Sequence, residues 1–339
     1  MPVGQMELID RQLLNILQSS FPLVAEPFKA LGNQLNTSEE EVMHRVAALK
    51  KQNIVRQISA IFDTRRLGYK TSLVAMRFAP ESLTKAAHHI NKHPGVSHNY
   101  ARHGYFNLWF TVAVSPSESL EETVARMATE TGAEAVRLLP TLKFFKIGVN
   151  FDMVEGKGAS YDYYNPDGHQ NGKAGWNEKE TITDSDVRVI RELQQDLPIT
   201  PRPFADMASR LGITEEELFA WAHAFEERGI MRRYSAVLHH RRAGFRANGM
   251  VVWKVPQERS EEVGRIMAAH PAVSHCYQRP TFPDWPYTHF TMVHATSKDG
   301  CEQVAREISK QTGIADYQAL YSYREFKKTR VRYFAEQEG

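Results

Sequence analysis

One short stretch of the chain alternates histidine, tyrosine and arginine with other residues, as His275, Tyr277 and Arg279. In a β-strand this spacing places all three side chains on one face. An imidazole donates protons or ligates a metal ion, and a guanidinium binds carboxylates through two parallel hydrogen bonds. The pattern therefore predicts a site that binds an anionic molecule and either protonates it or ligates its metal.

Three other stretches carry the same residue types. Residues 231–242 read MRRYSAVLHHRR, residues 285–291 read WPYTHFT, and residues 323–328 read YREFKK. Aromatic rings stack on flat molecules and basic side chains bind carboxylates, so we expect one pocket for a large, flat, polyanionic ligand. The candidates from these stretches are Arg232, Arg233, Tyr234, His239, Trp285, Tyr287, His289 and Lys327.

A thinner version of the pattern lies earlier in the chain, where His98, Tyr100 and Arg102 repeat the alternation, and Arg56 and Lys146 accompany them. Structural roles compete with several of these assignments. A solvated surface is the more typical place for the basic residues that follow position 240, and loop packing explains a tryptophan beside two prolines equally well.

Both patterns belong to an internal duplication, in which one unit of roughly 150 residues occurs twice. Glu26-Pro27-Phe28 matches Arg202-Pro203-Phe204 at an offset of 202 − 26 = 176 residues, and the copies align again at Phe145-Lys146 and Phe326-Lys327. Only the second copy has the insertion Pro283-Asp284-Trp285. The basic, histidine and tryptophan residues are denser there, which favours the second copy as the half that carries the site.

The pattern of apolar residues predicts the same elements in each copy. In copy one, helical spacing from Ile9 to Leu17, then Leu31 and Leu35, and then a capping box of Ser38 and Glu41 indicate three short helices. A two-stranded wing is expected over 54–62. The order β-α-β-β-α-β follows, which predicts a ferredoxin-like sandwich with an antiparallel sheet.

The fold class is therefore α+β, a tandem repeat of a winged helix-turn-helix and a ferredoxin-like sandwich. The predicted domains are a helix-turn-helix over 1–66, a sandwich over 67–152, a polar linker over 153–180, a second helix-turn-helix over 181–242 and a second sandwich over 243–336.

Composition argues against several classes of protein. A formal charge of +2 and an acidic third helix in copy two, with five Glu and one Arg over 214–229, do not favour DNA binding. Cys276 and Cys301 lack metal-site spacing and are too few for a disulfide framework, so we expect a reducing cytoplasm. Neither an apolar run long enough for a membrane helix nor a signal peptide is visible.

A helix-turn-helix followed by a ferredoxin-like sandwich resembles the Lrp/AsnC family of regulators. The segment VSHNYARHGYFNLWFTVAV (96–114) resembles one subunit type of the sirohaem decarboxylases, which are diverged Lrp/AsnC relatives. The segments RRYSAVLHHRRAGFRANGMVVW (232–253) and VSHCYQRPTFPDWPYTHFTMVH (273–294) resemble the partner subunit. The chain thus looks like a fused two-subunit form whose halves pair with each other; further homo-oligomerisation is left open.

This resemblance implies removal of two acetate carboxylates from sirohaem, with no cofactor beyond the iron-containing substrate. The product would enter either d-type haem assembly for nitrite reductase or an alternative pathway of haem biosynthesis. Our hypothesis for the roles takes His275 as proton donor or as axial ligand of the substrate iron, with Tyr277 or Tyr234 orienting the acid. Peripheral carboxylates would be bound by Arg232, Arg279 and Lys327, while Trp285 and Tyr287 would wall the ring. The residues of copy one would form a second site or interface structure, and His289 would add an acid or a ligand or have no role.

Two other functions fit the same elements. One is an Lrp/AsnC-type transcription regulator that senses haem or a small effector. The other is a tetrapyrrole carrier without catalysis.

Overall fold

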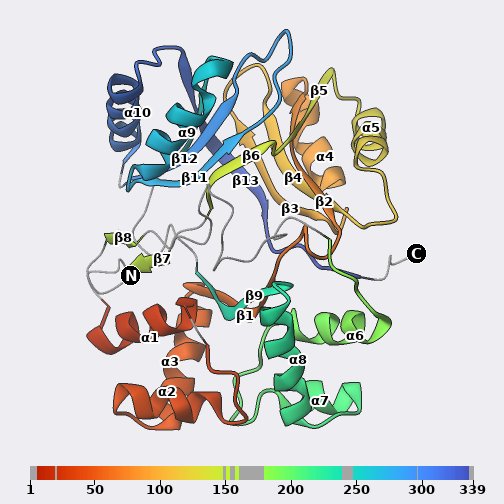
Figure 1. The fold of residues 1–339 in the computed structure, drawn as a ribbon, viewed down its shortest axis with the longest axis vertical. Coiled ribbons are helices and arrows are strands. Elements are labelled where there is room, and N and C mark those ends of the chain that lie inside the picture. The colour runs from red at the N-terminus through yellow and green to blue at the C-terminus, as the bar shows by residue number, and fades with distance from the viewer. Residues whose placement is uncertain are drawn as a thin grey trace. The chain divides into compact units, whose positions relative to one another are not determined.

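A computed structural model describes residues 6–19, 21–147, 150–152, 157–159, 179–238, 247–295 and 297–335. Contacts between residues divide the chain into two compact units. Unit 1 contains Met1–Leu67, Asn150–Ala159 and Asn177–Arg246, and unit 2 contains Gly68–Val149 and Ala247–Gly339. Each unit therefore combines like parts of the two copies, with the helix-turn-helix parts in unit 1 and the sandwich parts in unit 2 (Figure 1).

Unit 1 has the three predicted helices twice. Those of copy one are α1 (Leu8–Ser19), α2 (Pro27–Leu35) and α3 (Glu39–Lys51), and those of copy two are α6 (Asp184–Leu193), α7 (Ala205–Leu211) and α8 (Glu215–Glu227). At the start of α8, Thr214 and Glu217 cap each other reciprocally. At α3 the Ser38 hydroxyl accepts a hydrogen bond from the Glu41 amide, but the Glu41 carboxylate lies 2.6 Å from Arg45, so the predicted box is only half formed.

The two-stranded wing predicted over 54–62 is wrong. Copy one supplies a single strand, β1 (Val55–Phe62), which pairs antiparallel with β9 (Met231–Leu238) of copy two. Ser59 lies opposite Ser235, its equivalent in the repeat, so the pairing has local two-fold symmetry. Strand pairing satisfies the backbone groups of both segments at once, and here each strand finds its partner in the other copy.

Unit 2 has the predicted order β-α-β-β-α-β in both copies. Copy one forms β2 (Lys70–Arg77), α4 (Pro80–Ile90), β3 (Val96–Arg102), β4 (Leu108–Val114), α5 (Leu120–Thr131), β5 (Ala135–Pro140) and β6 (Lys143–Ile147). Copy two forms β10 (Ala247–Trp253), α9 (Ser260–Ala269), β11 (Val273–Gln278), β12 (His289–Ala295), α10 (Lys298–Thr312) and β13 (Tyr317–Lys328), with a short 3-10 turn (Gln257–Arg259) before α9.

These strands form one nine-stranded sheet in the order β5-β2-β4-β3-β13-β10-β12-β11-β6. The C-terminal strand of each copy crosses to the other copy: β13 pairs with β10 and then with β3, while β5 pairs with β2 and β6 pairs with β11 (Figure 1). Only Thr141 and Leu142 separate the two edge strands β5 and β6, so the sheet curls back on itself.

The curled sheet has two faces with separate apolar cores. Helices α4 and α5 cover the outer face of copy one, and α9 and α10 cover that of copy two. The inner face holds a core shared by both copies, with Phe106, Trp109, Trp285, Phe290 and Leu320 buried together. This shared core joins the two sandwiches within unit 2.

The predicted linker 153–180 falls mostly outside the described residues. At its start β7 (Asn150–Asp152) pairs with β8 (Lys157–Ala159).

Candidate active site

Strand β11 presents the alternating row that the sequence predicts. The partners of His275 and Tyr277 across the sheet are Met292 and Phe290, which belong to the inner-face core, so the row faces inward. The His275 and Tyr277 rings have centroids 5.8 Å apart, and the guanidinium carbon of Arg279 lies 5.0 Å from the Tyr277 ring centroid. The three side chains therefore form one continuous line on the inner face.

Strand β3 of copy one has an equivalent row. The ring centroids of His98 and Tyr100 are 6.3 Å apart, and the Arg102 guanidinium carbon lies 5.5 Å from the Tyr100 centroid. Tyr100 pairs across the sheet with Trp109 of the inner core. Both copies thus keep the same row of side chains on the same face.

A β-bulge at the start of each row brings a serine beside the histidine. In copy two, Ser274 and His275 together oppose Met292, and in copy one Ser97 precedes His98 at the same irregularity. Such a bulge turns two consecutive side chains toward one side of the sheet. The Ser274 hydroxyl lies 2.8 Å from His275 Nδ1, and the Ser97 hydroxyl lies 3.0 Å from His98 Nδ1.

Sequence reasoning missed Ser274 and its second partner, His294. Nε2 of His294 lies 2.8 Å from the Ser274 hydroxyl. Burial, and then the charge of Lys328, lower the pKa of His294 to about 4. The repeated Ser-His dipeptide was a signal available in the sequence, but the approach of a histidine from the neighbouring strand required the sheet register.

The buried arginines of the two rows join the copies. Nη1 of Arg102 donates to the carbonyl oxygen of Leu320 in copy two at 2.6 Å, and Nη1 of Arg279 donates to that of Leu139 in copy one. Burial lowers the pKa of Arg279 to about 10. These contacts favour an interface role for both arginines over the predicted binding of substrate carboxylates.

Lys327 and Lys146, which are equivalent in the repeat, also hold the opposite copy. Lys327 donates to the carbonyl oxygens of Asn91 at 2.8 Å and His93 at 3.4 Å, just after α4, and Lys146 donates to that of His270 at 3.3 Å, just after α9. Burial lowers the pKa of Lys327. Cations at helix C-termini satisfy unpaired carbonyls, so both positions favour helix capping over catalysis or substrate binding.

His289 faces the side of the sheet that the helices cover. Its Nε2 lies 3.0 Å from the Ser260 carbonyl oxygen, its Nδ1 lies 3.0 Å from the Thr288 hydroxyl, and its ring stacks on Phe145 with centroids 5.4 Å apart. Burial lowers its pKa to about 4. This environment favours a structural role over the predicted contact with substrate.

Trp285 belongs to the shared inner core. Its ring centroid lies 5.3 Å from that of Trp109 and 5.6 Å from that of Phe106. Tyr287 packs against Trp285 at 5.0 Å, and burial raises the pKa of its hydroxyl. The insertion of copy two thus anchors the two sandwiches to each other, and of these two residues Tyr287 is the less buried.

The remaining predicted residues belong to unit 1. Arg232 donates to the Asp63 carboxylate at 2.8 Å. Tyr234 is buried, its ring centroid 5.8 Å from that of Phe21 and 5.5 Å from that of Phe204, and this burial raises its pKa. Arg56 lies on β1 and Arg233 on β9, both partly exposed, and His239 lies outside the described residues.

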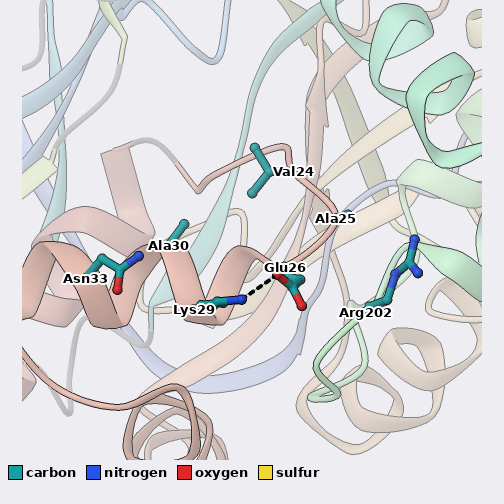
Figure 2. Close-up of a pocket in the computed structure, with 7 residues that line it drawn as sticks. All are labelled: Val24, Ala25, Glu26, Lys29, Ala30, Asn33 and Arg202. Atoms are coloured by element: carbon teal, nitrogen blue, oxygen red, sulfur yellow. Dashed lines mark hydrogen bonds and ion pairs between the residues drawn. The ribbon is translucent and has the colours of Figure 1, made fainter.

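A separate hollow of about 460 Å³ occurs in unit 1 (Figure 2). Within it Lys29 forms an ion pair with Glu26 at 2.9 Å. Its lining includes no predicted site residue and consists of Val24, Ala25, Glu26, Lys29, Ala30, Asn33 and Arg202.

Among the described residues, no group of histidine, cysteine, aspartate and glutamate is arranged to hold a metal ion. Over the same residues, no helix has the length and apolar character needed to cross a bilayer.

Models of known protein families match the helix-turn-helix part and the sandwich part of both copies. The model of an AsnC-like ligand binding domain matches residues 66–146 and 242–327, and that of the "Siroheme decarboxylase NirDL-like HTH domain" matches 10–56 and 186–232. The solved structure of "the siroheme decarboxylase NirDL in co-complex with iron-uroporphyrin III analogue" is 35% identical, with a TM-score of 0.72 over 96% of this chain and 95% of that one.

Some relatives align with nearly the whole of this chain, and others align with about half of it. The "Siroheme decarboxylase beta subunit" of Methanosarcina barkeri is 49% identical over 148 residues, which are 44% of this chain and 97% of that subunit. The "Siroheme decarboxylase" of Hydrogenobacter thermophilus is 39% identical over 96% of this chain and 95% of its own. The chain therefore belongs to the sirohaem decarboxylase family, in its fused, duplicated form.

Proposed function

We propose that this chain is a sirohaem decarboxylase, which converts two acetate side chains of sirohaem to methyl groups and releases two molecules of carbon dioxide. The observation that carries this proposal is the likeness to named sirohaem decarboxylases along nearly the whole chain, both copies included. A solved relative that binds an iron-uroporphyrin III analogue supports an iron tetrapyrrole as the substrate. We further propose that the product enters haem biosynthesis.

Each decarboxylation breaks the bond between the acetate methylene and its carboxylate. Carbon dioxide leaves, the electron pair stays on the methylene carbon, and a proton must arrive there. The tetrapyrrole ring can delocalise this electron pair, so no separate cofactor is needed. A general acid contributes roughly 10²–10⁴-fold to such a rate, and one substrate consumes two protons.

We assign the proton donor to His275, with Tyr277 orienting the imidazole from 5.8 Å along the same row. In copy one, His98 and Tyr100 serve a second site or the scaffold; we favour the scaffold.

The decisive experiment is anaerobic incubation of the purified full chain with sirohaem, followed by mass spectrometry of the tetrapyrrole. The expected product is lighter than sirohaem by two carbon dioxide units. Tight binding of sirohaem with no loss of mass would support a carrier instead, and unchanged, unbound sirohaem would overturn both functions.

For the helix-turn-helix parts we propose a pairing role, through β1 and β9, and no binding of DNA. The acidic character of α8, with five glutamates over 214–229, supports this because it would repel phosphates. A salt-sensitive, sequence-specific gel shift would favour a transcription regulator. Cys276 and Cys301 are buried free thiols, which suits the reducing cytoplasm that we propose as the location.

A further inference from the structure

We propose that Ser274 and His294 are positioning residues for His275: a chain of hydrogen bonds through the Ser274 hydroxyl keeps a proton on His275 Nδ1 and leaves Nε2 as the nitrogen that exchanges protons with the substrate. The inference rests on the proposed function where it takes His275 as the proton donor. The chain of hydrogen bonds itself is independent of that assignment.

The bulge in β11 makes this chain of hydrogen bonds possible. Ser274 and His275 both oppose Met292, so the serine hydroxyl and the imidazole point to one side. The hydroxyl oxygen lies 2.8 Å from His275 Nδ1 and 2.8 Å from His294 Nε2. A regular strand would have sent the Ser274 side chain to the opposite face.

The tautomer of neutral His294 sets the direction of this chain of hydrogen bonds. A serine hydroxyl has one proton to donate, while its oxygen accepts from other donors. His294 is neutral near pH 7 because burial and Lys328 lower its pKa to about 4, and we take its one ring proton to lie on Nδ1, so that Nε2 accepts the Ser274 proton. The carbonyl oxygen of Met292, at 3.3 Å, is a longer alternative acceptor. Ser274 then accepts from Nδ1–H of His275.

This direction suits an acid that acts twice on one substrate. Protonated His275 gives its Nε2 proton to the methylene carbon as the carbon–carbon bond breaks, and it becomes a neutral imidazole that still has its Nδ1 proton. Nε2 then takes a new proton from water before the second carboxylate leaves. The Nδ1–H bond to Ser274 holds the ring in place throughout.

Copy one has no counterpart of His294 in this chain of hydrogen bonds. Ala113 occupies the position equivalent to His294 in the repeat, and the Ser97 hydroxyl lies 2.8 Å from the hydroxyl of Thr111 instead. A second hydroxyl can donate as well as accept, so it sets no direction and no tautomer for His98. The hydrogen bonding therefore separates two rows that are otherwise alike, and it assigns the positioned acid to copy two.

Nitrogen NMR of isotope-labelled histidine tests the chain of hydrogen bonds without any turnover of sirohaem. In the wild-type protein, neutral His275 should have its proton on Nδ1. In His294→Leu the Ser274 hydroxyl loses its shorter acceptor and should turn to His275 Nδ1 in preference to the Met292 carbonyl oxygen at 3.3 Å, so the His275 proton should move to Nε2. The same tautomer of His275 in both proteins would overturn the proposal, whether or not the protein decarboxylates sirohaem.

Kinetics with sirohaem give the second test. Ser274→Ala and His294→Leu should each lower kcat by roughly 10- to 100-fold, with the dissociation constant for sirohaem unchanged. His294→Gln should recover most of the rate, because the amide oxygen of glutamine can accept from Ser274. The double variant should be no slower than either single one, since each breaks the same chain.

Thr111→Val in copy one is the matched control and should leave kcat unchanged. Additive losses in the double variant, or no recovery in His294→Gln, would reduce Ser274 and His294 to packing residues. An equal loss in Thr111→Val would assign the acid to both copies and contradict the proposal. If the wild-type protein leaves sirohaem unchanged, the proposed function fails, and the NMR result still decides the hydrogen-bond chain.

Discussion

Arg102 of copy one donates a hydrogen bond to the carbonyl oxygen of Leu320 in copy two at 2.6 Å, and both residues are buried. Arg102→Met should therefore destabilise unit 2, because a buried carbonyl left without its donor costs about 1–3 kcal/mol. Urea unfolding followed by tryptophan fluorescence would measure this, since Trp109 and Trp285 lie in the inner core. As a control, Arg77→Ala removes an exposed ion pair with Glu134 and should cost less than about 1 kcal/mol.

Gly264 on α9 of copy two packs closely against Phe145 on β6 of copy one. A Cβ added there would lie 2.4 Å from ring atoms of Phe145. Helix propensity alone would favour alanine by about 1 kcal/mol, but overpacking should make Gly264→Ala destabilising by about 1–3 kcal/mol. In a Phe145→Leu background the same change should become neutral or stabilising. A stabilising effect with Phe145 intact would contradict the close crossing of β6.

The ion pair of Asp63 and Arg232 should make the stability of unit 1 depend on pH. Burial raises the pKa of Asp63, but Arg232 and then Arg65 lower it by more, so the folded-state pKa lies below the usual value. The ionised Asp63 carboxylate therefore stabilises the fold above about pH 4, and this stabilisation is lost as pH falls further. Asp63→Asn should flatten the acid limb of a plot of unfolding free energy against pH, and an unchanged acid limb would contradict this role of the ion pair.

Buried His289 predicts a second dependence on pH, in a higher range. Its pKa of about 4 lies below that of an unfolded histidine, about 6.5, so stability should fall as pH drops through that interval, by roughly 3 kcal/mol at most. His289→Gln should reduce the slope there, leaving the part due to His294. Thermal unfolding between pH 7 and pH 4 would measure it. An unchanged slope in His289→Gln would contradict the assignment.

The two rows allow a direct test of which copy carries the acid. His275→Ala should lower kcat by about 10²–10⁴-fold, the usual contribution of a general acid, while His98→Ala should reduce it far less. Product formation from sirohaem under anaerobic conditions is the measurement, with binding followed by absorbance. Full activity in His275→Ala together with loss in His98→Ala would reverse the assignment of the two copies.

The row of side chains on β11 followed from local pattern. The alternation of His275, Tyr277 and Arg279 correctly predicted a shared strand face, because side-chain direction along a strand depends only on the backbone. The sequence pattern did not show which of the basic side chains a substrate could contact. Arg279 and Lys327 bind backbone carbonyls of the other copy, and the sequence contains no sign of those acceptors.

The sequence by itself determined the duplication, the order of helices and strands in each copy and the family, because these depend on residue type and spacing. The tertiary structure decided that β1 pairs with β9, that the C-terminal strands cross between copies, and that His294 reaches Ser274. Each of these depends on contacts between distant segments. Such contacts are selected by burial and backbone pairing over the whole unit, and no short stretch of sequence encodes them.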